Sequence, residues 1–342
     1  MEQKIYNEYV EILKEELLPA MGCTEPIAVA YAAAVAVQAL GEKPESVEVN
    51  VSANIIKNVK SVVVPCTGGL RGIGAAVCAG IVAGCPEKEL EILEEITGEQ
   101  KVEMKKMLDT MPMTIRESDK EYIFDIQIKA CAGGHSGYVE IAGFHTNVIC
   151  VKKDDEIIRE KAYEEQGSSC ATDRSLLTVE KIIEFADCVD VADVEEVLQR
   201  QIDYNWAIAE EGMTGKWGAA IGKTLMEAYG NSVHNRAKAM AAAGSDARMN
   251  GCELPVVINS GSGNQGMTTS LPVIVYAKEL NVSKEMMLRA LVVSNLITIH
   301  MKTGIGRLSA YCGAISAGCG AGAGICYLYG GRAYEISHVI VN

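Results

Sequence analysis

Residues 21–40 have the sequence MGCTEPIAVAYAAAVAVQAL, in which a Met-Gly break is followed by a proline and an alanine-rich stretch. Proline suits the first turn of a helix, because the N–H that it lacks has no intrahelical partner there. We therefore predict a helix from Pro26 to Leu40. Its N-terminus would carry Cys23, Thr24 and Glu25, at a place where backbone N–H groups and the helix dipole favour anions.

The segments on either side of this helix predict an α+β N-terminal half. Residues 2–20 have apolar side chains at helical spacing, and residues 46–151 contain short alternating or apolar runs typical of strands. The predicted strands are 47–51, 61–65, 123–127, 138–141 and 148–151, and the predicted helices between them are 71–83 and 87–108.

After about residue 175 the pattern is helical almost throughout. The fold class is therefore α+β: N-terminal helices and a mixed α/β subdomain (1–175), followed by a mainly helical domain (176–342). Aromatic residues make up only 5% of the chain and there are 33 glycines, so helices must pack through close contacts. The predicted C-terminal helices are 178–187, 193–211, 218–229, 233–243, 267–280, 284–300 and 306–329.

Composition excludes several classes of function. A formal net charge of −14 without a Lys/Arg cluster argues against a nucleic-acid partner. Residues 1–16 are charged and lack the apolar core of a signal peptide, so we expect a cytoplasmic protein with reduced cysteines. The uncharged stretch 308–331 is mostly Gly, Ala, Ser and Cys, which favours a buried helix over a membrane span. Twelve reduced cysteines indicate metal binding or catalysis rather than a disulfide framework.

The segment Gly22–Pro26 allows two interpretations. A thiolate at a helix N-terminus has a lowered pKa and is a good metal ligand or nucleophile, and Glu25 beside it is a candidate base. Alternatively, Thr24 caps the helix and Cys23 is a small buried residue. The segment alone does not separate them.

A second motif, NSGSGNQG at residues 259–266, precedes an apolar helix. Its glycines and polar side chains predict a cradle for a carboxylate or phosphate, although a flexible loop is the alternative. Arg248, at the end of the preceding helix, is suited to a substrate carboxylate, to pairing with Asp246, or to stabilising the helix dipole. The predicted ligand-binding residues of the motif are Ser260, Gly261, Ser262, Gly263, Asn264 and Gln265.

Other candidates follow predicted strands or belong to the last long helix. Asn54, Lys57 and Asn58 follow one strand and Pro65–Gly69 the next, and such strand-end loops often line sites. His145 lies in a strand context, where a structural role is common. Cys312, Cys319 and Cys326 recur every seven residues, a rise of about 10.5 Å that prevents all three from reaching one cluster.

Together these motifs resemble the family of L-cysteine desulfidases and related serine-dehydratase-like proteins. They occur in the family's order over nearly the whole chain. The resemblance rests on Gly22–Pro26, Asn54 with Lys57-Asn58, Gly143 with His145-Thr146-Asn147, Gly215–Gly218, Ser245–Met249, Asn259–Gly266, and Arg307–Ala310 with Cys312.

The resemblance implies an oxygen-labile [4Fe–4S] cluster held by three cysteines, with one iron open to substrate. Cys23 and Cys312 match two of the ligands. In the family the third lies in a Cys-Asp-Gly-type segment, and the sequence reaches Asn342 before any such segment. The implied reaction is β-elimination from L-cysteine or L-serine.

Site roles follow from the same resemblance. We expect Arg248 and the 259–266 loop to orient the substrate carboxylate. Candidates for the base that removes the α-proton are Glu25, Lys57 and His145. Further predicted substrate-binding residues are Asn54, Asn58, Asn147, Arg307 and Ser309.

Two other functions remain open on the sequence. A pyridoxal-phosphate lyase would use Lys57 for the Schiff base and Ser262–Gly266 for the phosphate, although the helical surroundings of that loop disfavour it. An inert amino-acid-binding or regulatory protein is the other alternative. The expected partner is a small amino acid, without nucleic acid or membrane, and the Gly/Ala-rich helices suit either a homodimer interface or internal packing.

Overall fold

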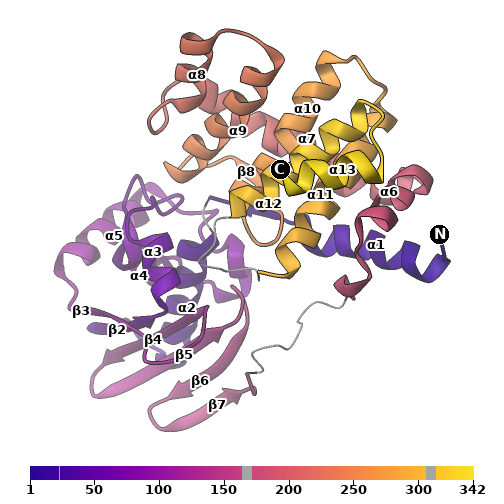
Figure 1. The fold of residues 1–342 in the computed structure, drawn as a ribbon. Helices are drawn as coiled ribbons and strands as arrows, with labels where there is room; N and C mark the ends of the chain where they lie inside the picture. The colour runs from indigo at the N-terminus through magenta and orange to yellow at the C-terminus, as the bar shows by residue number, and fades with distance from the viewer. Residues whose placement is uncertain (23, 164–171, 306–312) are drawn as a thin grey trace. The chain divides into compact units, whose positions relative to one another are not determined.

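The computed structural model describes residues 1–22, 24–163, 172–305 and 313–342 (Figure 1). They form two compact units. One is Met21–Ser168, here the sheet unit, and the other combines Met1–Ala20 with Ser169–Asn342, here the helical unit. The α+β class predicted from the sequence is confirmed.

Six strands among the described residues of the sheet unit form one sheet in the order β3-β2-β4-β5-β6-β7 (Figure 1). β2 and β3 are parallel, and the other neighbours are antiparallel. The predicted strand at 61–65 is wrong, since this segment makes only an isolated bridge between Val63 and Arg71. The strands are β2 (Ser46–Val51), β3 (Met113–Glu117), β4 (Asp125–Ala132), β5 (His135–Ala142), β6 (Val148–Lys153) and β7 (Glu156–Glu160).

Helix α2 (Thr24–Leu40) packs on one face of this sheet and against helix α4 (Gly72–Ala83). Glycines permit both contacts. A Cβ on Gly137 of β5 would lie 2.1 Å from the Ala36 carbonyl oxygen, and one on Gly80 of α4 would lie 1.9 Å from that of Ala30. The close packing expected from the composition therefore occurs at α2. The other helices of the unit are α3 (Ala53–Val59), the 3-10 helix η1 (Pro86–Glu91) and α5 (Gly98–Thr110).

Helix α1 (Gln3–Glu16) contributes its apolar face to the core of the helical unit. Tyr9 is fully buried there, with its ring 5.2 Å from the ring of Phe185 on α6 (Val179–Cys188) and its hydroxyl donating to the Leu176 carbonyl at 2.9 Å. The sequence predicts this helix as part of the N-terminal domain. In the structure its buried side chains belong to the helical unit, because their apolar partners are on α6, α7 (Ala192–Met213) and α11 (Lys284–Thr303).

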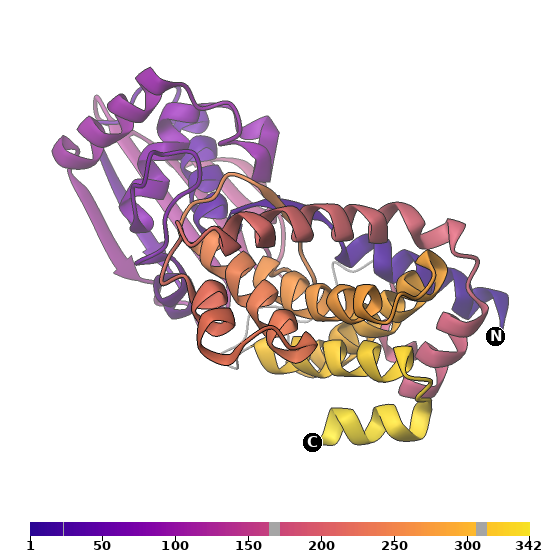
Figure 2. The same ribbon diagram turned by 90° about the horizontal axis from the view of Figure 1, so that it is seen from above.

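The helices of the helical unit lie side by side in Figure 2. The predicted helices from 178 onward correspond to α6–α12, and α13 is a further helix that the sequence pattern does not predict. None of the helices among the described residues is both long enough and apolar enough to cross a membrane. They are α6 (Val179–Cys188), α7 (Ala192–Met213), α8 (Ile221–Tyr229), α9 (Val233–Met249), α10 (Gly263–Glu279), α11 (Lys284–Thr303), α12 (Gly313–Leu328) and α13 (Ala333–Val341).

A fully buried amide network joins α7, α11 and the segment before α10. The Asn295 side chain on α11 exchanges two hydrogen bonds with Gln201 on α7, at 2.8 and 3.0 Å. The same Asn295 oxygen accepts a bond from the Asn259 side chain at 3.0 Å. All three residues are 0% exposed. Since buried polar groups are costly unless paired, these amides fix where the chain enters the 259–266 turn.

A second buried amide supports the strand that leads into this turn. Asn205 on α7 accepts from the Val257 backbone N–H at 2.8 Å and donates to the Ser270 hydroxyl on α10 at 3.0 Å. Val257 belongs to β8 (Pro255–Val257), which pairs with β1 (Pro19–Met21). The turn is thus held at its start by β8 and at its end by α10.

Replacing Gly80 with alanine should destabilise the sheet unit, because the added methyl would overlap the Ala30 carbonyl. Overpacking of this kind costs about 1–3 kcal/mol. Gly98→Ala is the control, since nothing lies within 4 Å of a Cβ at Gly98. Scanning calorimetry of both variants measures the difference, and equal midpoints for Gly80→Ala and Gly98→Ala would contradict the close contact.

Replacing Asn295 with alanine should destabilise the helical unit, because it leaves the buried Gln201 amide without its partner and leaves the Asn259 amide nitrogen only its 3.4 Å bond to the Asn295 backbone carbonyl. Each unsatisfied group costs about 1–3 kcal/mol. Gln199→Ala on α7 removes only an exposed bond to Asp203 and should change stability by less than about 0.5 kcal/mol. Both tryptophans, Trp206 and Trp217, lie in this unit, so their fluorescence during urea unfolding gives the comparison.

Candidate functional site

The 259–266 segment is an ordered turn that opens α10. The backbones of Asn259 and Ser262 exchange two hydrogen bonds of 3.1 Å, and Ser260 and Gly261 between them have φ of 50° and 79°. The Ser262 hydroxyl caps the helix by accepting from the Gln265 N–H at 3.4 Å. The helix begins at Gly263, earlier than the predicted 267, so Asn264 and Gln265 lie in its first turn.

Arg248, in the last turn of α9, is buried beside this helix start and is only 3% exposed. Its Nη1 donates to the Asn264 side-chain oxygen at 3.1 Å, and its Nε has no hydrogen-bond partner among the described residues. A Cβ on Gly263 would lie 2.4 Å from that Nε, so the glycine lets the guanidinium reach the turn. No carboxylate of the described residues lies within 4.0 Å of Arg248. A buried charge needs compensation, and this one is suited to an anion.

The Asp246 carboxylate contacts the loop and helix that follow α7 and does not pair with Arg248. Its Oδ2 accepts from the Ile221 N–H at 2.8 Å, at the start of α8. A Cβ on Gly218 would lie 2.6 Å from its Oδ1, so the 215–218 loop packs directly on this carboxylate. The structure therefore contradicts pairing of Arg248 with Asp246, because Asp246 is occupied by the loop and helix that follow α7.

Gln265 connects the turn to the start of α12. Its side chain is 6% exposed, and its Oε1 has no hydrogen-bond partner among the described residues. A Cβ on Gly313 would lie 2.4 Å from the Gln265 Cδ, so any other residue at 313 would require the Gln265 side chain to move. Gly313 follows Cys312 in the sequence. Arg307, Ser309 and Cys312 themselves, predicted as site residues, lie outside the described residues.

In the sheet unit, the structure brings together Glu25 and Asn58. Glu25 is in the first turn of α2, where one carboxylate oxygen accepts from the Thr24 hydroxyl and the other from the Asn58 amide of α3, both at 3.3 Å. Thr24 is buried and Glu25 is half-buried. This carboxylate is therefore held in a defined position by two neutral donors.

The loop Pro65–Gly69 packs against the residue that precedes Cys23. Gly22 has φ of 55°, and a Cβ on it would lie 2.1 Å from the Pro65 Cγ. Thr67 closes the loop, with its hydroxyl donating to the Val64 carbonyl at 2.7 Å and accepting from the Leu70 N–H at 3.2 Å. The loop thus lies beside the Gly22 turn, whereas Cys23 is outside the described residues.

The remaining candidates of the sheet unit have structural contacts. Asn54 donates to the Ile123 carbonyl at 3.4 Å, and Lys57 on the same short helix is exposed. The strand context predicted for His145 is wrong, because the positive φ of Gly143 ends β5 and starts a turn. His145 packs edge-on to Phe124, with ring centroids 5.0 Å apart.

Asn147 belongs to the same turn and closes it. Its amide donates to the Ala142 carbonyl at 2.8 Å, and its side-chain oxygen accepts from Lys161 at 3.2 Å. These bonds satisfy both the nitrogen and the oxygen of the side-chain amide. Asn147, a predicted substrate-binding residue, therefore stabilises this turn.

The described residues contain no group of three or more His, Cys, Asp or Glu side chains suited to hold a metal ion. The two cysteines assigned to the cluster by resemblance, Cys23 and Cys312, lie outside those residues. Among the described cysteines, Cys78 on α4 is fully buried, and burial raises the pKa of its thiol to about 11. A thiol with so high a pKa is a poor metal ligand at neutral pH.

Comparison of the sequence with known proteins identifies its family. The model of the serine dehydratase alpha chain matches residues 87–342. A UPF0597 protein of Desulfitobacterium hafniense is 57% identical over 100% of this chain and 79% of its own length. UPF0597 proteins of Lachnoclostridium phytofermentans and Treponema denticola are 50% and 43% identical, over 99% and 100% of this chain and 81% of each relative. The chain belongs to the serine dehydratase alpha-chain family.

Proposed function

We propose that the protein catalyses [4Fe–4S]-dependent β-elimination from a small L-amino acid. L-cysteine would give pyruvate, ammonia and sulfide, and L-serine would give pyruvate and ammonia. The observation that carries the proposal is the buried Arg248 guanidinium, which has no carboxylate partner among the described residues and lies at the N-terminus of a 17-residue helix.

The substrate α-carboxylate would bind between Arg248 and the first turn of α10. Helix N-terminal N–H groups and a guanidinium both favour a carboxylate, and the guanidinium can contact both of its oxygens. Asn264 holds the guanidinium from one side by its 3.1 Å hydrogen bond. The guanidinium, which has no carboxylate partner among the described residues, would then be paired in the complex.

For the base we favour Glu25 over Lys57 and His145. The Thr24 and Asn58 donors fix the Glu25 carboxylate, which can accept a proton. Lys57 is exposed, and the His145 ring packs on Phe124. Loss of the α-proton to the base and of the β-thiol or β-hydroxyl as the leaving group gives 2-aminoacrylate. This product tautomerises to the imine, and water then converts it to pyruvate and ammonia.

The proposal includes the [4Fe–4S] cluster because two cysteines of the chain are assigned as its ligands. Cys23 and Cys312 are assigned to it by the family's motifs, and Gly313, next to Cys312, packs against Gln265 of the 259–266 turn. When bound, the cluster would supply a Lewis-acidic iron for the leaving group.

Cys23→Ala and Cys312→Ala should each lower the iron and sulfide content of anaerobically reconstituted protein well below that of the unmodified chain, because each removes one thiolate ligand. Cys78→Ala is the control and should keep the full content, since its thiol is buried and protonated. Release of pyruvate from L-cysteine and L-serine is measured on the same samples. Full iron in both ligand variants, or no product from iron-replete protein, would contradict the proposal.

Arg248→Met should weaken binding of L-cysteine or L-serine by at least about tenfold, because a buried charge–carboxylate contact contributes roughly 1.5–3 kcal/mol. Arg248→Lys should bind with intermediate affinity, since an ammonium keeps the charge without the two-pronged geometry. Arg236→Met, about three turns earlier on α9, is the control, because Arg236 pairs with Glu279 instead. Calorimetric titration measures the affinity, and unchanged binding in Arg248→Met would exclude this carboxylate site.

A further inference from the structure

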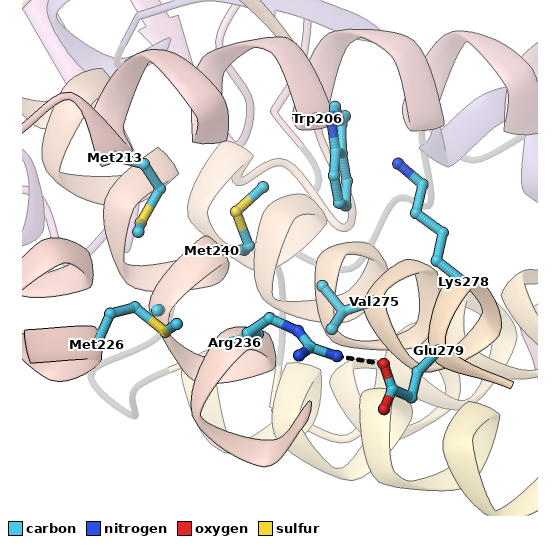
Figure 3. A pocket seen from close by; sticks show the side chains of 9 residues that line it. Trp206, Met213, Met226, Arg236, Met240, Val275, Lys278 and Glu279 are labelled. Carbon is cyan, nitrogen blue, oxygen red and sulfur yellow. Dashed lines mark hydrogen bonds and ion pairs between the residues drawn. The ribbon is translucent and has the colours of Figure 1, made fainter. Parts of the chain in front are cut away.

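A cavity in the helical unit lies among α7, α8, α9 and α10, with a volume of about 330 Å³ (Figure 3). This is within the usual size range of sites for small organic ligands. Its wall combines a large apolar surface with three charged side chains. The lining residues are Trp206, Met213, Met226, Arg236, Ala239, Met240, Val275, Lys278 and Glu279.

The apolar wall is built mostly from thioethers and an indole. Met213, Met226 and Met240 come from three different helices and surround the cavity together with Trp206 (Figure 3). Methionine side chains are flexible and polarisable, and their sulfur atoms make favourable contacts with aromatic rings. Such a wall adapts to a flat apolar body better than a wall of branched aliphatic side chains would.

The charged groups leave one positive charge uncompensated within the cavity. Arg236 and Glu279 pair with each other, as the dashed line in Figure 3 shows. Lys278 has no carboxylate within 4.0 Å among the described residues, and its ammonium lies 3.1 Å from the centroid of the Trp206 ring. Desolvation lowers the pKa of Lys278, and the negative charge of Glu210 opposes this effect. The lining thus has one more cationic than anionic side chain, on a chain of formal net charge −14, and this local excess favours an anion.

We propose that this cavity is a ligand site for a small aromatic monocarboxylate, whose ring would pack on the wall of Trp206 and the methionines and whose carboxylate would bind Lys278. A carboxylate there would pair with the Lys278 ammonium, which has no carboxylate within 4.0 Å among the described residues. The Arg236–Glu279 pair closes the neighbouring side, so a second carboxylate on the ligand would meet Glu279.

This site is separate from the substrate site proposed above. Lys278 follows Asn264 by fourteen residues on α10, which corresponds to roughly 21 Å along a helix. None of the cavity-lining residues belongs to the 259–266 turn, and none is a cysteine. Binding to this cavity therefore does not require the cluster, and it is measurable in protein without iron.

The test uses 3-phenylpropionate as the probe, with 3-phenylpropanamide and 3-phenylpropylamine as neutral and cationic analogues of the same shape. Calorimetric titration of the full chain should give the acid an affinity at least about tenfold higher than either analogue. In a Trp217→Phe variant, Trp206 is the single remaining tryptophan, and it lines the cavity. A change in its fluorescence on addition of the acid would show that the acid binds in this cavity. Equal affinity for acid and amide, or no binding of the acid, would overturn the proposal.

Lys278→Met tests the contact itself. It keeps a long side chain at a largely exposed position, so we expect normal folding and at least about tenfold weaker binding of the acid. Lys238→Met is the matched control, because Lys238 is an exposed lysine of α9 that does not line the cavity. Acid binding by Lys278→Met as tight as by Lys238→Met would show that the carboxylate lies elsewhere.

Discussion

Three buried amides hold the segment on which the proposed chemistry depends. Asn295 satisfies Gln201 on one side and Asn259 on the other, all without contact with solvent. An amide network of this kind has few alternative arrangements, because any shift leaves a donor or acceptor unpaired in a low-dielectric interior. It therefore fixes the path of the chain into the turn at Ser260 and Gly261, where left-handed backbone conformations reverse its direction.

The position of this turn explains why a charged residue can be buried nearby. α10 begins immediately after the turn, so its first N–H groups and Asn264 lie beside Arg248. Gly263 has no side chain, and a Cβ at this position would lie 2.4 Å from the Arg248 Nε. Among the residues that the structure describes, Arg248 is held by neutral contacts and has no carboxylate partner. Binding of an anion at this position would thus be favoured by a charge that the fold has already desolvated, so part of the cost of desolvation is met during folding.

Periodicity predicted the helices after residue 175 well, because long amphipathic patterns report directly on a buried face. It failed where backbone geometry decides the structure. The Ser61–Pro65 run is apolar like a strand but ends in a turn with Cys66 at φ 60°, and His145 lies after a glycine at φ 83°. The motif at 259–266 was recognisable from its residues. Its supports were not, since Gln201, Asn205 and Asn295 are polar residues within helices, and sequence does not reveal which amides meet in three dimensions.

The two ends of α10 present opposite electrostatic environments to a bound carboxylate. At the N-terminus the helix dipole itself favours an anion, so side-chain and backbone groups act together with Arg248. At the C-terminal end, the unpaired carbonyl groups carry partial negative charge and oppose one. An anion in the cavity near Lys278 must therefore be held by side-chain cations alone, and Arg236 is already committed to Glu279. It follows that the substrate site should retain some affinity without its arginine, whereas the cavity should lose its preference for acids entirely without its lysine.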